Sequence, residues 1–420
     1  MQPSGQLSAG IAPAPRITTP ILPESLACGT KILKVKSYDA AILGLGALGS
    51  ATLLALAARG IRVLGIDRLS PPHQFGSSHG GSRITRQAIG EGAHLTPLAM
   101  RSQTLWRDIE REAGAELFTV TGLLVISSAQ RTGFTHVEGF FATTVEAAGT
   151  NGIAHELLDT AALRRRFPQF RIGDGEEAYF EPGGGVLRPE ACVAAQIALA
   201  RRAGAHVCTD EPVLRFVPRA HDVLIETPTQ TWCANTLVLA AGPWLPELLA
   251  ESLVPYFRIF RQVQFWFAPR ADVFGPDRFP IFIWELRNRT QSLYGFPQID
   301  EYGVKIATEQ YRATTTAASA DRRVDEAECR AMHEQYVAPF LPAISPHCLR
   351  ASACLYTVTP DFGFIIDRHP DSDRIIIASC CSGHGFKHAP ALGEAIAEMA
   401  LDGTSRIDMR PFALARFARH

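Results

Sequence analysis

The distribution of apolar residues near the start of the chain predicts a strand, a helix and a second strand in succession. An apolar run of strand length, 40–43, leads into the turn GLGALG at 44–49. The next segment, 48–58, is rich in Ala and Leu and contains no Pro, as is typical of a helix. A second apolar stretch, 61–66, ends on Asp67. The pattern predicts a βαβ unit whose first turn is G-x-G-x-x-G.

The turn and the acid that follows the second strand predict dinucleotide binding. Gly44 permits the tight turn, Gly46 lets the backbone approach a pyrophosphate, and Gly49 lets the helix pack close to the strand. The helix N-terminus offers N–H groups and a positive dipole end to phosphates. Asp67 is placed to accept hydrogen bonds from ribose hydroxyls. The motif alone does not distinguish FAD from NAD, and the alternative is an α/β sheet with an incidental Gly-rich turn.

Alternating apolar and polar residues farther along the chain predict an antiparallel layer. The alternation occurs at 259–267, 281–285, 292–296 and 303–307. We therefore expect a mixed α/β (α+β) fold, with a Rossmann-like layer interrupted by an antiparallel sheet. The remaining elements are predicted as strands at 118–126, 178–181, 223–227, 236–240 and 375–378, and as helices at 97–113, 137–148, 160–166, 189–203, 327–337 and 390–401.

The length and the net charge of the chain limit the class of protein to which it can belong. A chain of 420 residues suggests two or three domains with sizeable cores. The formal net charge of −1 argues against general attraction to nucleic acid or to an anionic membrane surface. No apolar run approaches the ~20 residues that a membrane-spanning helix needs. Residues 1–37 are rich in Pro and lack the apolar core of a signal peptide, so we expect a disordered or loosely docked extension.

The cysteines indicate a reducing compartment. There are nine, an odd number, and none forms a C-x-x-C motif. Their pattern argues against a disulfide framework and against a zinc site, and we expect no bound metal. It suits a cytoplasmic protein.

Several charged residues lie in Gly-rich turns. Arg83 and Arg86 are in the loop after the second strand, and Lys387 is in a strand-to-helix turn near the C-terminus. Such cations, if they converge on one cleft, would bind a carboxylate. The alternative is that each caps a helix or forms a surface ion pair. Equally, Lys305 could be a solvated lysine on an edge strand, and Cys354 could be a buried structural cysteine. Spacing alone does not show which of these residues are functional.

Three segments, placed after the G-x-G-x-x-G strand, resemble one known family. GSSHGGSRITRQ (76–87), CLYTVTPDFGFIIDRHP (354–370) and SGHGFKHAPALGE (382–394) are similar to the monomeric sarcosine oxidase family, which includes N-methyltryptophan oxidase and pipecolate oxidase. The resemblance extends from Tyr38 to nearly the C-terminus. It implies an FAD-dependent amine oxidoreductase that consumes molecular oxygen.

The resemblance also implies how FAD is held. Cys354 matches the cysteine that forms a thioether to the flavin, so the cofactor is expected to be covalent. His79 and Arg83 match residues beside the flavin ring. Gly385 and Phe386 fall in the turn that meets the ring, where backbone N–H groups can stabilise negative charge.

Further residues are implied to act on the substrate and on oxygen. Arg86 and Lys387 match the pair that holds the substrate carboxylate, and Tyr294 matches an active-site tyrosine. Lys305 matches the lysine that activates oxygen, because a fixed ammonium stabilises charge developing on oxygen.

Two positions suggest a pocket that differs from that of sarcosine oxidase. Glu309 stands where sarcosine oxidase has a histidine, four residues after the oxygen-activating lysine. Trp284 lies in a strand expected near the substrate, where its ring could stack on a bound molecule. We therefore expect Trp284 and Glu309 to contact a substrate larger than sarcosine.

We expect the chain to consist of an N-terminal extension and two interleaved domains, because the antiparallel layer interrupts the α/β layer. The extension is 1–37, the FAD-binding domain is expected at 38–117, 183–255 and 360–420, and the substrate domain at 118–182 and 256–359.

The predicted function is the oxidation of a secondary or N-methyl α-amino acid, cyclic ones included, to an imine with release of hydrogen peroxide. We expect a cytoplasmic monomer or homodimer. One alternative is a flavin dehydrogenase that passes electrons to a carrier, against which Lys305 argues. Another is an NAD-dependent reductase or a dinucleotide sensor, which leaves Cys354 and Lys387 without roles.

Overall fold

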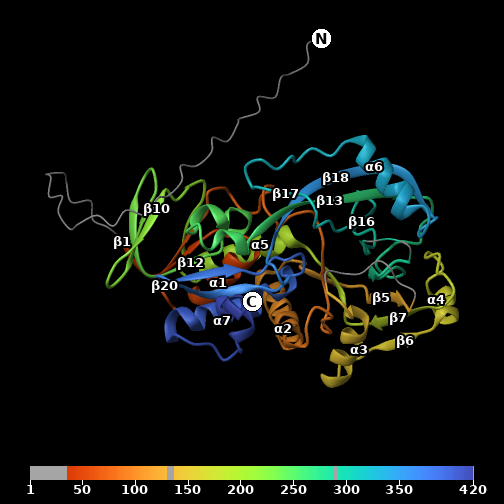
Figure 1. The fold of residues 1–420 in the computed structure, drawn as a ribbon, viewed down its shortest axis with the longest axis horizontal. Helices are drawn as coiled ribbons and strands as arrows, with labels where there is room; N and C mark the ends of the chain where they lie inside the picture. The colour runs from red at the N-terminus through yellow and green to blue at the C-terminus, as the bar shows by residue number, and fades with distance from the viewer. Residues whose placement is uncertain (1–35, 130–136, 288, 290, 420) are drawn as a thin grey trace, which may run out of the picture.

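The computed structural model of the chain describes residues 36–129, 137–287, 289 and 291–419. The predicted extension therefore lies outside the described residues, except for 36 and 37. Two large sheets occupy opposite sides of the molecule, and helices α1, α5 and α7 lie with the first of them (Figure 1). Within the described residues, no helix is long and apolar enough to cross a membrane.

The first sheet has a parallel centre. Strand β1 pairs in parallel with β2 on one side and with β12 on the other, and β12 pairs in parallel with β20. The strands of this sheet are β1 (Lys36–Leu43), β2 (Val63–Ile66), β9 (His206–Cys208), β10 (Arg215–Pro218), β11 (Val223–Glu226), β12 (Thr231–Leu239), β19 (Ile365–His369) and β20 (Ser372–Ser379). Its helices are α1 (Ala47–Ala57), α2 (Thr96–Ala113), α5 (Pro189–Arg202) and α7 (Ala389–Asp402).

The predicted βαβ unit is confirmed as β1, α1 and β2. Gly44 has a φ of 91°, and a Cβ on it would lie 2.6 Å from the carbonyl oxygen of Ala240. A Cβ on Gly49 would lie only 1.8 Å from the carbonyl oxygen of Gly44. Only a hydrogen atom fits as the side chain at these two positions. Because both residues are glycine, α1 can start directly beside the end of β1.

The second sheet is mainly antiparallel, as the alternating pattern predicts. Strand β13 pairs with β16, β16 with β15, and β15 with β14, each in the antiparallel sense. Strand β14 instead pairs in parallel with β5. These two strands come from separate parts of the chain, so no hairpin sets their relative direction. The strands are β5 (Leu123–Ser128), β6 (Glu156–Leu158), β7 (Glu176–Glu181), β13 (Arg258–Pro269), β14 (Ile281–Trp284), β15 (Leu293–Phe296), β16 (Val304–Thr308), β17 (Thr314–Thr315) and β18 (Ile344–Val358).

Some elements differ from the expected ones. The strand predicted at 118–126 is two strands, because Gly122 has a φ of 75° and bends the chain between β4 (Phe118–Val120) and β5. Strand β4 joins a small third sheet with β3 (Arg83–Thr85) and β8 (Gly185–Leu187). The helix expected at 327–337 is α6 (Glu326–Met332) followed by a π-helix at His333–Val337. Helix α3 is Phe140–Thr150, and α4 is Thr160–Arg166 with Asp159 as its N-cap.

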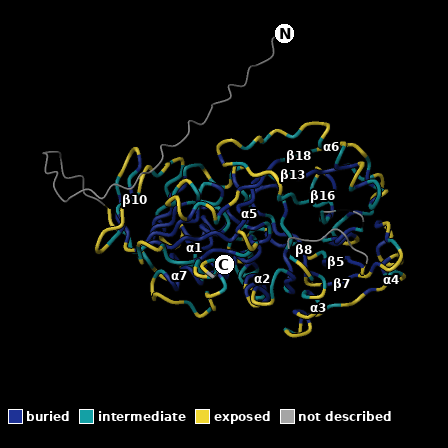
Figure 2. The backbone as a smooth tube through the Cα atoms, in the orientation of Figure 1, coloured by how far each residue is buried: buried dark blue, intermediate teal, exposed yellow. Residues whose placement is uncertain are grey.

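Each sheet has its own buried core, which appears as dark blue backbone in Figure 2. In the second core, Trp284 is completely buried. Its ring makes edge contacts with Phe170, at a centroid distance of 5.8 Å, and with Phe340, at 5.1 Å. Its indole Nε1 donates to Glu176 Oε1 over 3.0 Å. The expectation that Trp284 contacts the substrate is therefore wrong: the side chain points into the core.

We predict that Trp284→Phe destabilises the protein without changing its ligand preference. The change removes part of a buried ring and leaves Glu176 without the indole donor, at a cost of about 3 kcal/mol. Urea unfolding measures the loss. The control is Trp244→Phe, because Trp244 is only partly buried and its loss should be smaller. A variant of unchanged stability would contradict this placement.

Candidate active site

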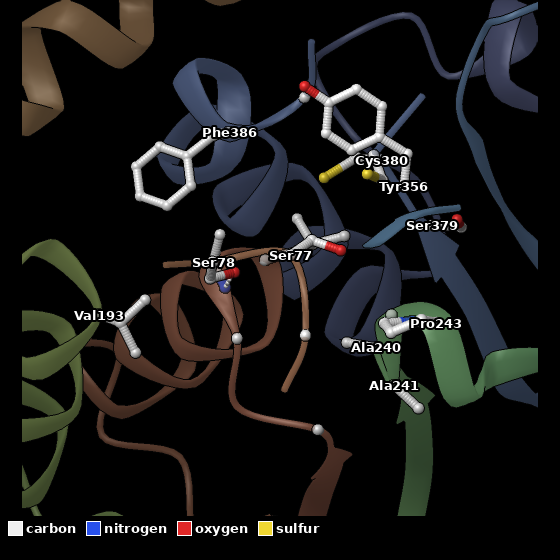
Figure 3. Close-up of a pocket in the computed structure, with 18 of the residues that line it drawn as sticks. Ser77, Ser78, Val193, Ala240, Ala241, Pro243, Tyr356, Ser379, Cys380 and Phe386 are labelled. Carbon is white, nitrogen blue, oxygen red and sulfur yellow. Dashed lines mark hydrogen bonds between the residues drawn. The ribbon is translucent and has the colours of Figure 1, made fainter. Parts of the chain in front are cut away.

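A cavity of about 540 Å³ lies between the two large sheets. One part is lined by residues at the carboxyl ends of β1, β2 and β12, where α/β sheets characteristically bind ligands. The other part is lined by residues of β14, β15 and β16. Figure 3 shows Tyr356, Cys380 and Phe386 at one end of the cavity, Ala240, Ala241 and Pro243 at the other, and Ser77 and Ser78 between them.

The end beside the first sheet has the features of a dinucleotide cradle. Gly44, Gly46 and Asp67 all line the cavity there. The Asp67 carboxylate accepts hydrogen bonds from the backbone N–H of Leu45, at 2.7 Å, and of Leu69, at 2.9 Å, which orient it. Burial raises the pKa of this carboxyl group. A Cβ on Gly49 would collide with the carbonyl oxygen of Gly44, so the turn keeps this shape only with glycine there, and the residues present fit a dinucleotide.

Arg83 and Lys305 hold the same loop from two sides. The Arg83 guanidinium donates to the carbonyl oxygens of Ser77 and His79, at 2.6 Å each, and of Ser82, at 2.7 Å. Lys305 Nζ donates to the carbonyl oxygens of Gly80, at 2.9 Å, and of Ser82, at 3.0 Å. Burial, and then the charge of Arg83, lower the pKa of Lys305 well below its usual value. Both cations line the cavity.

His79 does not line the cavity. Its side chain is completely buried, and neither ring nitrogen has a hydrogen-bond partner among the described residues. Burial and the charge of Arg83 lower the pKa of His79 to about 3, so the ring is neutral. The contribution of His79 to the site that this structure shows is its backbone carbonyl oxygen, which accepts a hydrogen bond from Arg83.

Arg86 and Lys387 meet on the cavity wall through a carboxylate that the sequence analysis missed. Arg86 Nη2 lies 2.6 Å from Glu91 Oε2, and Lys387 Nζ lies 3.9 Å from Glu91 Oε1. Lys387 Nζ also donates to the carbonyl oxygen of His384 over 2.6 Å. Burial lowers the pKa of Lys387 to about 8, although Glu91 opposes the shift. The two cations are thus brought together as expected, and Glu91, five residues after Arg86 in the same loop, is the residue that joins them.

Cys354 lies beside the cavity and not on its wall. Its thiol is buried and accepts a hydrogen bond of 3.1 Å from Gln264 Nε2. Gln264 does line the cavity. Burial raises the pKa of the Cys354 thiol. Gln264 is a second residue that sequence reasoning missed, because only the pairing of β13 with β18 places it next to the cysteine.

Tyr294, Glu309 and Phe386 line the cavity as expected. The hydroxyl of Tyr311 donates to Glu309 Oε2 over 2.9 Å. Burial raises the pKa of Tyr294. The ring of Phe386 stacks on Trp106 at a centroid distance of 5.8 Å and lies at the end of the cavity (Figure 3).

The turn before Phe386 also lines the cavity. A Cβ on Gly385 would lie 1.2 Å from the carbonyl oxygen of Cys380, so the turn depends on glycine. In the part of the chain that the structure describes, no group of three or more His, Cys, Asp or Glu side chains is arranged to hold a metal ion.

Comparison with known proteins identifies the family. The family model described as FAD dependent oxidoreductase matches residues 39–399. A monomeric sarcosine oxidase of Streptomyces avermitilis is 40% identical over 374 residues, which cover 88% of this chain and 95% of that protein. An N-methyl-L-tryptophan oxidase of Salmonella heidelberg is 33% identical over 393 residues, covering 91% of this chain and 100% of that one.

Solved structures share the fold. The amino acid oxidase NikD, in its open form, superimposes with a TM-score of 0.78 at 24% identity, over 90% of this chain and 98% of NikD. The L-proline dehydrogenase of P. horikoshii gives a TM-score of 0.76 at 21% identity, over 92% and 99% of the two chains. The expected mixed α/β fold and the resemblance to sarcosine oxidases are confirmed. With the cradle and its two glycines in place, the chain belongs to the FAD-dependent oxidoreductase family, among relatives named monomeric sarcosine oxidase and N-methyl-L-tryptophan oxidase.

Proposed function

We propose that this protein is an FAD-dependent oxidase of a secondary or N-methyl α-amino acid, cyclic ones included, which forms an imine and hydrogen peroxide. The observation that carries the proposal is the pair of cations, Arg86 and Lys387, on the wall of the cavity that contains the dinucleotide cradle. Relatives at 40% and 33% identity carry the names of oxidases of N-methyl amino acids. A cytoplasmic location and a monomeric or homodimeric state belong to the same proposal.

Gly44, Gly46, Gly49 and Asp67 are the residues that would hold FAD. When bound, FAD supplies the two-electron redox chemistry. Arg83, which is partly buried, and Lys305, which is buried, place two positive charges at the same loop on the cavity wall. Fixed cations in a site of low dielectric stabilise negative charge strongly, because they need no reorganisation as it develops.

The cations Arg86 and Lys387 would bind the α-carboxylate. Arg86 is 1% exposed, and its Nε has no hydrogen-bond partner among the described residues. A buried guanidinium N–H without a partner costs free energy, and a carboxylate oxygen would satisfy it. Glu91 holds both cations on the cavity wall before the substrate enters.

Lys305 favours oxygen as the electron acceptor. Its Nζ donates to two carbonyl oxygens, which favour the protonated amine against the lowering of its pKa by burial. It lies 4.7 Å from the ring centroid of Phe296 and 5.2 Å from that of Trp266. A charge held so firmly is suited to stabilise superoxide as it forms. The second candidate is a dehydrogenase that passes electrons to a carrier, since a chain named L-proline dehydrogenase shares the fold. The NAD-dependent alternative is not retained, because the family is FAD-dependent.

A peroxide-release screen of N-methyl and cyclic amino acids tests the proposal directly. Peroxide formed in stoichiometric amounts with at least one α-amino acid would support an oxidase. Flavin reduction without peroxide formation in air would favour the dehydrogenase.

We predict that FAD is bound covalently through Cys354. The wild-type protein should retain its flavin in the pellet after acid precipitation, whereas Cys354→Ala should release it to the supernatant. Cys348→Ala is the matched control, because Cys348 lies on the same strand, β18. Flavin that stays in the Cys354→Ala pellet would place the attachment at another residue.

We predict that Lys305→Met slows reoxidation by oxygen far more than reduction by substrate. The loss of one preorganised charge typically costs ~3 kcal/mol, or ~10²-fold in rate. Stopped-flow absorbance measures the two half-reactions separately. Lys305→Arg keeps the charge and should lose less. Equal losses in both half-reactions would rule out the assignment to oxygen.

We predict that substrate binding weakens above pH about 8. Below that pH Lys387 carries its proton and attracts the carboxylate; above it the amine is neutral, so kcat/KM should fall as the pH rises through the lowered pKa. Lys387→Met should cost about 1.5–3 kcal/mol of binding free energy, or ~10- to 100-fold in kcat/KM. In this variant kcat/KM should no longer fall as the pH rises through 8. Lys387→Arg keeps the positive charge, so the fall in kcat/KM should occur at a higher pH than in the wild type. Amino-acid amides that react as well as the acids would show that no carboxylate is bound here.

A further inference from the structure

Gln264 lines the cavity, and the proposed function assigns it no role. It lies on β13, two residues after Gln262, which pairs directly with Cys354 of β18. Alternate residues of a strand point to the same face of a sheet, so Gln264 and Cys354 are diagonal neighbours on one face. Because Cys354 lies beside the cavity and Gln264 lies on its wall, Gln264 connects the thiol to the cavity.

The Gln264 amide contacts the sulfur directly. Its Nε2 donates to Cys354 Sγ over 3.1 Å, and the side chain is 2% exposed. Its Oε1 has no hydrogen-bond partner among the described residues. A buried oxygen without a partner costs free energy, so this orientation of the amide, with its N–H toward the sulfur, calls for a functional explanation.

Gly80 confines the amide to this position. A Cβ on Gly80 would lie 2.0 Å from Gln264 Oε1 and 2.9 Å from its Cδ. Gly80 also has a φ of 101°, which favours glycine. The amide therefore packs against the backbone of the loop whose carbonyl oxygens bind Arg83 and Lys305. Since both cations fix this loop, the loop in turn keeps the amide beside the sulfur.

The surroundings of the Cys354 thiol include groups that oppose its ionisation and groups that favour it. Burial raises the pKa of the thiol, whereas the charge of Arg83, the hydrogen bond from Gln264 and the charge of Lys305 lower it. The pKa remains above its usual value, so a small fraction of the thiol is ionised near neutral pH, and each group that stabilises the thiolate raises that fraction. The titratable side chains around the thiol are Arg83, Lys305, Cys381, Tyr294 and Tyr356.

We propose that Gln264 is a positioning residue for the attachment of FAD: its amide N–H holds the sulfur of Cys354 and favours the thiolate, which is the reactive form. The inference rests on the proposed function, in which Cys354 carries the flavin. Attachment joins Sγ to the 8α carbon of the flavin ring. The S–H bond and one C–H bond break, two protons are released, and two electrons reduce the ring. Molecular oxygen then takes up these two electrons and two protons as hydrogen peroxide.

The rate of FAD attachment to the cofactor-free full chain measures this role apart from catalysis. Protein made in riboflavin-starved cells is mixed with FAD in air, samples are acid-precipitated at intervals, and the flavin in each pellet is measured. Gln264→Met keeps the length of the side chain and removes the donor, so it should slow attachment on the order of 10- to 100-fold. Quenching of flavin fluorescence on mixing should show that non-covalent binding of FAD is retained.

The pH dependence of attachment separates this role from a merely structural one. In the wild type, attachment should accelerate as the pH rises and the thiol ionises. A donor to the sulfur stabilises the thiolate and lowers the pKa of the thiol, so its removal in Gln264→Met should move this acceleration to a higher pH.

Gln262→Met is the matched control. Gln262 lies on the same strand and face and is also 2% exposed, but its amide binds the backbone N–H and carbonyl of Gln310, at 2.9 Å and 2.7 Å. This variant should lose stability and keep the rate and the pH dependence of attachment. If Gln264→Met does not fold, Gln264→Leu, which also lacks the donor, takes its place, and the wild-type pH dependence still tests whether the thiolate limits the rate.

Four outcomes contradict these expectations. An attachment rate that is unchanged in Gln264→Met, or slowed with no change in its pH dependence, overturns the inference while attachment at Cys354 stands. A wild-type rate that does not vary with pH does the same. A loss of non-covalent binding as large as the loss of attachment would show that Gln264 holds FAD and not the thiol. Wild-type protein without flavin in the pellet, or Cys354→Ala with it, overturns the proposed attachment at Cys354 itself.

Discussion

The close approach of backbones around helix α1 is the constraint on which the site depends. Gly49 lets α1 start against the end of β1, and on the opposite side a Cβ at Gly393 of α7 would lie 2.7 Å from the carbonyl carbon of Ala51. Helix α1 is therefore held between the strand and α7 with no room for side chains at either contact. Since α7 directly follows the turn that carries Lys387, one packed helix connects the cofactor cradle to the cation that would bind the substrate.

The charges of the site follow a single principle. Each buried cation is held by carbonyl oxygens or by a carboxylate: Arg83 and Lys305 by loop carbonyls, and Arg86 by Glu91. Removing ions from water is expensive, and only well-formed partners offset that cost. The loop carbonyls fix Arg83 and Lys305 and leave their positive charges in place, as electrostatic stabilisation of a reaction requires. Glu91 fixes Arg86 and offsets one of the two positive charges of Arg86 and Lys387.

Sequence periodicity predicted the elements that lie near one another in the chain. The βαβ unit, the alternating antiparallel strands and the helix at 160–166 are local patterns, and they are confirmed. Strand β18, with Pro346 near its start and polar residues along its first half, has no such pattern and was missed. The strands of the two large sheets come from different ranges of the chain, and the proposed division into domains stays a prediction.

The site shows where a linear pattern stops being informative. Trp284 belongs to an apolar strand that is buried on both faces, so the sequence indicated burial and could not tell core from cavity. His79 and Cys354 match family positions, yet the structure places neither of them on the cavity wall. Glu91 and Gln264 have their roles only because distant segments meet, and no spacing in the sequence marks them.

The loop between Ser77 and Ser82 has a consequence for biosynthesis. Its carbonyl at Gly80 is held by Lys305, a residue 225 positions later in the chain. During translation the cradle strands emerge from the ribosome early, but this loop has no ammonium to organise it until β16 has been made and has paired with β13. The loop therefore gains all of its side-chain contacts only after β16, which ends at Thr308, has been made.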